Sequence, residues 1–302
     1  MHNSQPGFLT VGLSPAIQKT VVFDTLYEGE VNRSEQYYLD AAGKAVNVCR
    51  VLTQAGEEAS CLTIAGKENR VLFEDLCSRD FLHLSTVETA GRVRTCTTLL
   101  NMENNSCTEL VVNEPEEVSP EEEEVLKKSF LRRMKEDFRC LIISGSRARG
   151  FSGEIIPFLV RTAKEKGLTV IADYRGTDLL GSFISRKIRP DYIKINEQEF
   201  FQTFPEYSDI SRGIKEVSEK YDCSFIISRG ALSTLIAERG ALSEVDSKLI
   251  DAVNPIGCGD SMTAGMAQGI LEGLSLREAV ERGRDYATRN ALSIHPGWIL
   301  ED

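Results

Sequence analysis

The sequence predicts an α/β fold built around a mostly parallel β-sheet, and three observations support this. Short apolar runs alternate with amphipathic segments along most of the 302 residues, which is the pattern of strands joined by crossover helices. The runs are apolar on both faces, as expected of strands that helices cover on each side. The chain is also long enough to bury about three quarters of the surface that its unfolded form exposes.

Six segments carry the strand pattern. They are FLTVGL at 8–13, SCLTIAG at 60–66, RCLIIS at 139–144, LTVIAD at 168–173, YIKIN at 192–196 and SFIIS at 224–228. We expect these segments to form the central sheet.

Several helix ends are visible between the strands. Apolar residues recur at helical spacing within 45–55, and Gly56 stands where this helix would end. Ser119 precedes a proline and a block of glutamates, which suits the positive end of a helix dipole. Ser275 and Glu278 have the spacing of a capping box that opens the last long helix.

Two stretches interrupt the alternation. Residues 20–40 and 93–112 have the pattern of strands joined by turns, with no helix between them. We expect them to form a small β-sheet inserted into a single main domain that spans residues 1–302. Such a sheet serves either as a lid over a cleft or as a dimer contact, because its edges and apolar surface need cover.

Composition argues against several classes of protein. A formal net charge of −11 disfavours nucleic acid as a partner. No apolar run approaches the length of a membrane span, and the first eight residues lack the pattern of a secretory signal, so we expect a cytoplasmic protein. The 8 cysteines stand singly and the 3 histidines are scattered, so we expect reduced thiols and neither a zinc site nor a histidine-based triad.

The segment NPIGCGDSMTAG at 254–265 places two glycines and Asp260 directly before a helical pattern. Free N–H groups at a helix start bind anions, and glycine permits a close approach. The segment is neither a Walker A loop nor GxGxxG, because no GK[ST] follows and Met262 holds the last position. Asp260 is either an ordinary helix cap or a base for a hydroxyl that attacks a phosphate. A carboxylate repels phosphate in a pure anion cradle, which favours the base.

A second glycine turn, AAGKAVNV at 41–48, also precedes a helix. Lys44 lies at the helix start, where the dipole disfavours a cation unless an anion is bound. It is therefore either a solvated lysine or a phosphate ligand. Asn47, one turn later, is either a local hydrogen-bonding residue or a ligand for a hydroxyl.

Polar residues follow three of the expected strands. Asn196 and Glu199 have capping-box spacing, yet they also lie at the strand edge where α/β sheets bind ligands and where oxygen atoms suit Mg²⁺. Asp173 is either a strand-end cap or a site residue. Ser228 and Gly230 by themselves indicate only a turn.

These motifs, in this order, resemble the ribokinase-like (PfkB-type) carbohydrate kinases, closest to the 1-phosphofructokinase and tagatose-6-phosphate kinase branch. The resemblance runs from about residue 10 to about residue 297. The segment at 254–265 is similar to the family's C-terminal signature and the segment at 41–48 to its GGKGxNVA element. Further similarities are EGEVNR at 28–33 to the lid motif, VRTCT at 93–97 to TRTN, SGS at 144–146, KxNxxE at 194–199 and SRG at 228–230.

The resemblance implies a three-layer ribokinase-like fold with a small β-sheet lid, through which such proteins often dimerise. It also implies a base at Asp260 and an anion hole formed by Gly257, Cys258 and Gly259. Implied substrate contacts are Gln18, Gly43, Lys44, Asn47 and Arg94, with Lys44 and Arg94 on the substrate's phosphate. Implied nucleotide contacts are Asn196, Ser228, Gly230 and Asn290, and Glu199 would organise Mg²⁺ together with Asn196.

The chain departs from the family pattern at several positions. SPAIQ at 14–18 stands for NPALD, so Gln18 replaces an aspartate; glutamine still donates and accepts hydrogen bonds but carries no charge. Cys96 replaces the asparagine of TRTN. Arg147 and Arg149 stand in a turn that is apolar in the family, and they are either exposed or contact a more anionic substrate.

We therefore expect ATP-dependent phosphorylation of a ketohexose phosphate, either fructose 1-phosphate or a tagatose phosphate. The expected cofactors are ATP and Mg²⁺, with a monovalent cation left open, and the expected partner is a second copy bound through the lid. The alternatives are a kinase of an unphosphorylated sugar or nucleoside and a non-catalytic sugar or nucleotide sensor. A Rossmann dehydrogenase is disfavoured, because no GxGxxG follows the first strand.

Overall fold

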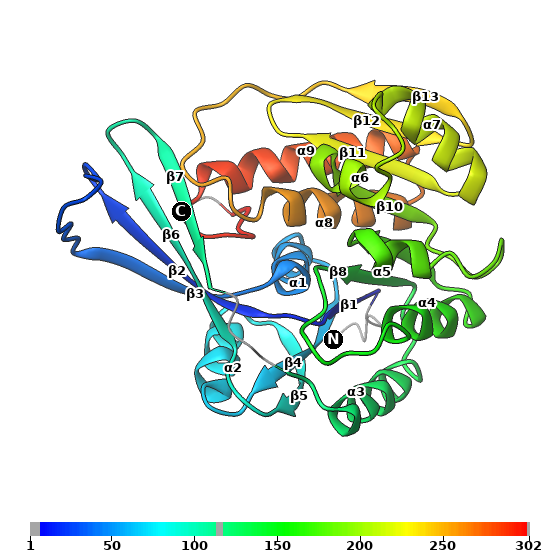
Figure 1. Ribbon diagram of the computed structural model, residues 1–302, viewed down its shortest axis with the longest axis horizontal. Coiled ribbons are helices and arrows are strands. Elements are labelled where there is room, and N and C mark those ends of the chain that lie inside the picture. The colour runs from blue at the N-terminus through cyan, green and yellow to red at the C-terminus, as the bar shows by residue number, and fades with distance from the viewer. Residues whose placement is uncertain (1–6, 113–116, 301–302) are drawn as a thin grey trace.

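The computed structural model describes residues 7–112 and 117–300, which form a layered main body and a separate small sheet (Figure 1). Residues 1–6, which include most of the stretch considered above for a secretory signal, lie outside the described residues. So do residues 301–302, the end of the expected domain. Within the described ranges, no helix has the length and apolar character needed to cross a membrane.

The larger sheet has nine strands among the described residues, in the order β13-β12-β11-β10-β9-β8-β1-β4-β5. Their bounds are β1 Phe8–Gly12, β4 Ala59–Gly66, β5 His83–Thr89, β8 Cys140–Ser144, β9 Thr169–Asp173, β10 Tyr192–Asn196, β11 Ser224–Arg229, β12 Leu232–Glu238 and β13 Ala241–Val245. All neighbouring pairs from β11 to β5 in this order are parallel, whereas β12 pairs antiparallel with both β11 and β13. The six predicted strands and the mostly parallel sheet are confirmed.

Helices cover both faces of this sheet (Figure 1). Their bounds are α1 Lys44–Gln54, α2 Arg70–Arg79, α3 Pro120–Arg133, α4 Ile155–Glu165, α5 Gly176–Gly181, α6 Glu197–Thr203, α7 Ile210–Tyr221, α8 Cys258–Leu271 and α9 Leu276–Leu292. Helices α3 to α7 contribute to one hydrophobic core, and α1, α2, α8 and α9 contribute to the other. Two cores on opposite sheet faces give the expected three layers.

The predicted helix caps form. The Ser119 hydroxyl accepts from the Glu122 backbone N–H, and Glu122 accepts in return from the Ser119 N–H at 2.7 Å. Ser275 and Glu278 form the same reciprocal pair at the start of α9. Gly56 has a positive φ of 84°, as expected of a glycine that follows the end of a helix.

The second sheet, called the lid sheet below, has the strand order β3-β2-β6-β7. Its strands are β2 Ala16–Phe23, β3 Gln36–Ala42, β6 Arg94–Asn101 and β7 Ser106–Val111, and the sheet extends to one side of the main body (Figure 1). Strand β2 begins at Ala16 rather than at residue 20. It pairs in parallel with β6 and antiparallel with β3, so segments far apart in sequence meet in this sheet.

At Gly66, the backbone lies very close to the backbone of Arg92, near the junction of the two sheets. Gly66 ends β4, and a Cβ atom at this position would lie 2.4 Å from the Cα atom of Arg92. The neighbouring Lys67 forms a β-bridge with Arg92, just before β6 begins at Arg94. The absence of a side chain at Gly66 therefore helps to set where the lid sheet leaves the main body.

We predict that Gly66→Ala destabilises the protein by about 1–3 kcal/mol, because the added methyl group would overlap backbone atoms that have no rotamer to change. Gly153→Ala is the control, since a Cβ atom there has no other atom within 4 Å. Urea unfolding of the wild type and both variants checks the prediction. Equal free energies of unfolding for the two variants would contradict it.

Candidate active site

A cleft of about 410 Å³ is lined by residues of the lid sheet, the carboxyl ends of β10 and β11, and the starts of α1, α6 and α8. It brings together most of the residues singled out in the sequence. Those that line it are Gln18, Gly43, Lys44, Asn47, Arg94, Asn196, Glu199, Ser228, Gly257, Gly259 and Asp260. Two segments more than 200 residues apart in the chain, around Lys44 and Asp260, therefore share one cleft.

The helices α1 and α8 both begin at a glycine beside this cleft. Gly43 has a φ of 106° and Gly257 a φ of 85°, and neither helix start has a side-chain cap among the described residues. At Gly257, a Cβ atom would lie 2.5 Å from the backbone nitrogen of Gly297. The first N–H groups of a helix lack partners within it and carry the positive end of the dipole. The cleft thus has two helix ends suited to an anion.

Asp260 is the third residue of α8, and only 7% of it is exposed. Its Oδ2 atom accepts a hydrogen bond from Asn47 Nδ2 at 2.8 Å. Burial is the main cause that raises the pKa of Asp260, and the negative charge of Asp173 raises it further. Lys44, Asn47 and Lys194 lower it, and the pKa that results is about 6. The carboxylate is therefore mostly ionised at neutral pH and still basic enough to accept a proton.

Asp173, at the end of β9, is the second buried carboxylate near the cleft. Its Oδ1 atom lies 3.0 Å from Lys44 Nζ, and its Oδ2 atom lies 3.7 Å from Lys194 Nζ. Oδ2 also accepts from the hydroxyls of Ser144 and Thr263, at 3.2 and 3.1 Å. Burial alone would raise the pKa of Asp173, but the two lysines outweigh it and hold the pKa below its ordinary value. Asp173 thus anchors the lysines and is no simple strand-end cap.

Lys44 lies between carboxylates. Its Nζ atom is 3.3 Å from Glu199 Oε1 as well as close to Asp173, and its side chain is 36% exposed. Burial lowers the pKa of Lys44, but Asp173, Glu199 and Asp260 together raise it, so the lysine stays charged. A charged, partly exposed amine at the cleft can contact an anionic ligand.

Asn196 and Glu199 form the capping box that their spacing predicts. Asn196 Oδ1 accepts from the Glu199 N–H at 2.8 Å, and Glu199 Oε2 accepts from the Asn196 N–H at 3.0 Å. Among the described residues, no group of three or more histidine, cysteine, aspartate or glutamate side chains is arranged to hold a metal. Glu199 nevertheless lines the cleft, and Mg²⁺ in kinases needs only one or two carboxylates beside the substrate phosphates.

On the lid side, Gln18 and Arg94 enter the cleft. Gln18 is 3% exposed, and its Nε2 atom donates to Thr98 Oγ1 at 2.7 Å. The Nε atom of Arg94 is buried without a hydrogen-bond partner in the part of the chain that the structure describes. Asp40, which is paired with Gln18 across β2 and β3, contacts His295 Nδ1 at 2.9 Å.

Three residues that the resemblance implied do not line the cleft. Asn290 is fully buried; its Oδ1 atom accepts from the Gly297 N–H at 2.6 Å, and its Nδ2 atom donates to the Ile256 carbonyl at 2.8 Å. It also lies 3.3 Å from the Sγ atom of Cys258, whose pKa is raised to about 11 chiefly by burial. Asn290 therefore holds the glycine turn from behind. Gly230 forms an exposed turn with a φ of 60°.

The two arginines of the SGSRARG turn also stay outside the cleft lining. Arg147 donates from Nε to Asp178 Oδ1 at 2.8 Å, which ties the turn to α5. Arg149 is exposed, and its carbonyl accepts from the Val118 N–H at 2.8 Å. The structure places both residues in contacts within the main body or at its surface.

Two charged residues at or behind the cleft received no role in the sequence analysis, although Lys194 begins the KxNxxE segment and lines the cleft. Lys194 is 3% exposed, and a Cβ atom on Gly259 would lie 2.8 Å from its Nζ atom, so it sits directly beneath the start of α8. Arg50 is 1% exposed and donates to Asn47. Lys194 interrupts the apolar pattern of a buried strand, and Arg50 interrupts that of a buried helix face. A charged residue at such a position was the sequence signal that could have marked both as candidates.

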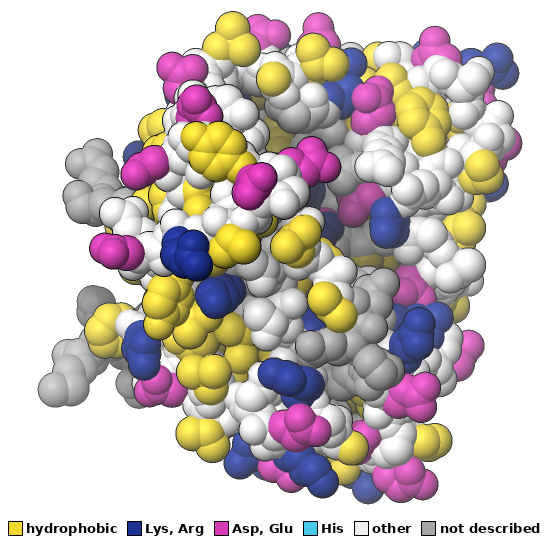
Figure 2. Space-filling model, turned by 60° about the vertical axis from the view of Figure 1, so that its left-hand side comes forward, with side chains coloured by type: hydrophobic (Ala, Val, Ile, Leu, Met, Phe, Trp, Pro, Cys, Tyr) yellow, Lys and Arg dark blue, Asp and Glu magenta, His cyan; other side chains and the backbone are white. Residues whose placement is uncertain are grey.

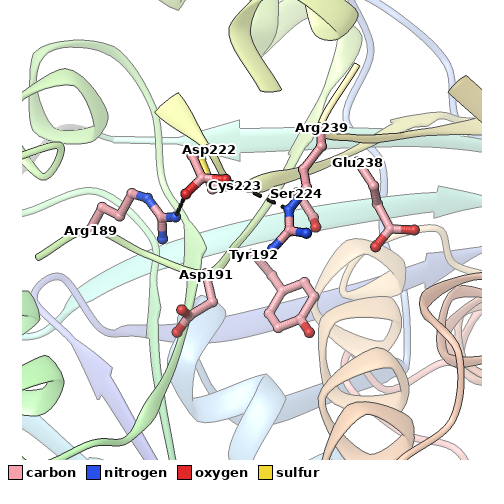
Figure 3. Close-up of a pocket in the computed structure, with 8 residues that line it drawn as sticks. All are labelled: Arg189, Asp191, Tyr192, Asp222, Cys223, Ser224, Glu238 and Arg239. Carbon is pink, nitrogen blue, oxygen red and sulfur yellow. Dashed lines mark hydrogen bonds and ion pairs between the residues drawn. The ribbon is translucent and has the colours of Figure 1, made fainter. Parts of the chain in front are cut away.

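A second cleft lies at the opposite, amino edge of β10 and β11 (Figure 3). Arg189 Nη2 is 2.6 Å from Asp222 Oδ2, and Figure 3 shows Arg239 directed toward the same carboxylate. Asp191 is bound by Lys164 at 2.7 Å. These two carboxylates are thus neutralised by neighbouring cations, and the carboxyl edge of the sheet remains the better candidate for a site.

Known proteins match this chain over most of its length. The model of the pfkB family carbohydrate kinases matches residues 13–294. Tagatose-6-phosphate kinase of Staphylococcus epidermidis is 28% identical over 299 residues, which cover 97% of this chain and 95% of that protein.

Solved structures show the same fold. Phosphofructokinase-2 from Escherichia coli in complex with fructose-6-phosphate superposes with a TM-score of 0.84 at 20% identity, covering 96% of this chain and 94% of that one. A structure of the same enzyme in complex with potassium has the same TM-score, identity and coverage. At this identity the likeness establishes the ribokinase-like architecture, with its large mixed sheet and small separate sheet.

Proposed function

The chain belongs to the pfkB family of carbohydrate kinases, and on this premise we propose that it transfers the γ-phosphoryl group of ATP to a hydroxyl of a ketohexose phosphate. The observation that carries the proposal is Asp260: a buried carboxylate with a pKa of about 6 at the amino end of α8, in a cleft with Lys44 and Arg94. Fructose 1-phosphate and tagatose phosphates are the acceptors we propose, and the similarity to a tagatose-6-phosphate kinase supports the latter.

In the proposed reaction, Asp260 accepts the proton of the sugar hydroxyl while the hydroxyl oxygen attacks the γ-phosphorus. The bond between that phosphorus and the bridging oxygen of ADP breaks, and ADP leaves with the electron pair. The backbone N–H groups of Gly257 and Gly259, which line the cleft, would stabilise the developing negative charge at the uncapped start of α8. The N–H of Cys258 already donates to the Pro255 carbonyl at 3.3 Å. Asp173 remains ionised throughout and keeps Lys44 and Lys194 in place.

We assign the phosphate of the sugar to Lys44 and Arg94. The buried Nε atom of Arg94 has no protein partner among the described residues, so a phosphate oxygen would satisfy it. Lys44 would exchange part of its contact with Asp173 and Glu199 for the phosphate. Gln18 donates to Thr98 through Nε2, which leaves its carbonyl oxygen to accept from a sugar hydroxyl.

We assign the binding of ATP to the carboxyl ends of β10 and β11. Asn196 and Ser228 face each other across these strands, and Glu199 follows on α6. Glu199 would hold Mg²⁺ with the ATP phosphates, and the ion would neutralise charge on the β- and γ-phosphates. The proposal includes a monovalent cation, because one of the similar structures is a complex with potassium. In this proposal Gly230 forms the turn beside the nucleotide, and Asn290 acts by supporting the glycine turn.

A homodimer through the lid sheet is part of the proposal. Tyr37, Leu39 and Leu110 are 60%, 37% and 50% exposed. They lie on one face of the lid sheet, because Leu39 and Leu110 belong to one cross-strand row and Tyr37 lies two residues from Leu39. Figure 2, which turns this side of the molecule forward, shows hydrophobic side chains gathered on it. Covering this apolar face would remove it from water.

We predict that Asp260→Asn lowers kcat by about 10²–10⁴-fold, because the base is lost. ATP binding measured by calorimetry should be retained. For the wild type, kcat/KM should fall as the pH drops below about 6, because protonation removes the base form of Asp260. Near-normal turnover of Asp260→Asn in a coupled ATP assay would contradict the assignment.

We predict that Lys44→Ala raises KM for phosphorylated ketoses by about 10–100-fold, the usual effect of losing a charged hydrogen bond. KM for free ketoses should change little. Lys166→Ala, which alters an exposed lysine at the end of α4, is the control. An unchanged KM for every sugar phosphate would favour a kinase that acts on a neutral sugar or nucleoside. Binding of these sugars without turnover of ATP would favour a non-catalytic sugar or nucleotide sensor.

We predict that the wild type is a dimer in solution at micromolar concentration and that Leu39→Glu with Leu110→Glu makes it monomeric. Two carboxylates on the apolar face would have to lose their hydration in the dimer. Light scattering coupled to size exclusion measures the mass. A wild-type monomer, or a double variant that remains dimeric, would contradict a dimer through this face.

A further inference from the structure

Arg50 in α1 is an arginine with 1% exposure that has no part in the reaction described above. Its guanidinium donates to groups from several segments: Nε to Asp80 Oδ2 at 2.7 Å, and Nη1 to Asn47 Oδ1 at 2.9 Å and to the Pro296 carbonyl at 3.1 Å. Nη2 donates to the Ala41 carbonyl. One buried side chain therefore joins α1, the end of α2, the lid sheet and the segment after α9.

The chemistry of the guanidinium determines how the Asn47 amide is oriented. Arginine has only N–H donors, so the atom of Asn47 that faces it must be the carbonyl oxygen. The amide nitrogen then points to the other side, where it donates to Asp260 Oδ2 at 2.8 Å. A flipped amide would place donors against donors at Arg50 and two acceptors against each other at Asp260. The contact with Arg50 therefore excludes the flipped orientation.

This orientation distinguishes the two oxygen atoms of Asp260. Oδ2 receives the N–H of Asn47 and is occupied as an acceptor. Oδ1 has no hydrogen-bond donor among the described residues, so both of its lone pairs are available and it is the oxygen to which we assign the substrate proton. The hydrogen bond to Oδ2 also favours the ionised carboxylate and partly offsets its burial. Of the charged groups that face Asp260 from other elements, Asp173 raises its pKa, and Lys44 and Lys194 lower it.

We propose that Arg50 is a positioning residue that acts through Asn47: it fixes the amide so that Asp260 keeps Oδ2 as an acceptor and takes the substrate proton on Oδ1. The inference rests on the proposed function of Asp260 and deepens it. In the step, the hydroxyl proton moves to Oδ1, the oxygen lone pair forms the bond to the γ-phosphorus, and ADP departs with the bridging pair. Arg50 does not contact the reacting atoms.

The test compares kcat/KM against pH for the wild type, Arg50→Met, Asn47→Leu and the double variant. Without Arg50 the amide is free to flip, and the ionised form of Asp260 loses its donor. We expect Arg50→Met to move the acid midpoint up by about 0.5–1 pH unit, the scale of one lost hydrogen bond. Asn47→Leu should move it similarly, and the double variant should show no further shift, because Arg50 acts through Asn47.

Asp80→Asn is the matched control. It removes the ion pair at the other end of Arg50 and leaves the contact with Asn47. We expect a lower melting temperature with an unchanged acid midpoint. A midpoint that shifts in Asp80→Asn as far as in Arg50→Met would contradict a route through Asn47.

Two results would overturn the inference: an Arg50→Met variant that loses activity equally at every pH, or a double variant whose shift is the sum of the single shifts. If Arg50→Met does not fold, Asn47→Leu carries the test, because leucine removes the donor to Asp260 without adding a charge. An unchanged midpoint in that variant equally overturns the inference. Failure of the proposed function is distinct, since it would appear as substantial turnover by Asp260→Asn whatever happens at Arg50.

Discussion

Two buried carboxylates at one edge of the sheet, held by unequal sets of donors, are the constraint on which the rest of the site depends. Asp173 has two lysines and two hydroxyls around it and stays ionised. Among the residues that the structure describes, Asp260 accepts from the Asn47 amide alone, and burial raises its pKa to about 6. The two environments push the pKa values apart, and in the proposed function one carboxylate serves as a fixed charge and the other as a base.

The two carboxylates have different surroundings because distant segments of the chain meet at this edge of the sheet. The parallel strands end at one edge, which brings Asp173, Lys194 and Asn196 together. The helices α1 and α8 begin at glycines beside that edge, so Lys44 and Asp260 face one cleft. Arg50 and Asn290 lie behind the cleft lining and hold these helix starts in place. The chemistry thus depends on buried polar contacts as much as on the residues that line the cleft.

Much of the fold was predictable, because a parallel sheet requires apolar runs on both faces and helices leave readable caps. The edge strands β5 and β13 were not predicted, since their exposed faces carry polar residues that hide the strand pattern. Strand β12 was not predicted either, although it is buried over residues 234–237. In the site, Asp260, Lys44 and Asn47 were suggested by glycine turns at helix starts. The role of Asp173 and the contribution of Lys194 and Arg50 depend on partners distant in sequence, which local patterns do not reveal.

The most direct test of the central claim is the pKa of Asp260 itself, measured by ¹³C NMR titration of its carboxyl carbon in the ligand-free protein. Comparison with Asp260→Asn assigns the resonance. The account predicts a midpoint near 6, with Asp173 still ionised well below that pH. A midpoint for Asp260 in the ordinary aspartate range, near 3.8, would contradict it.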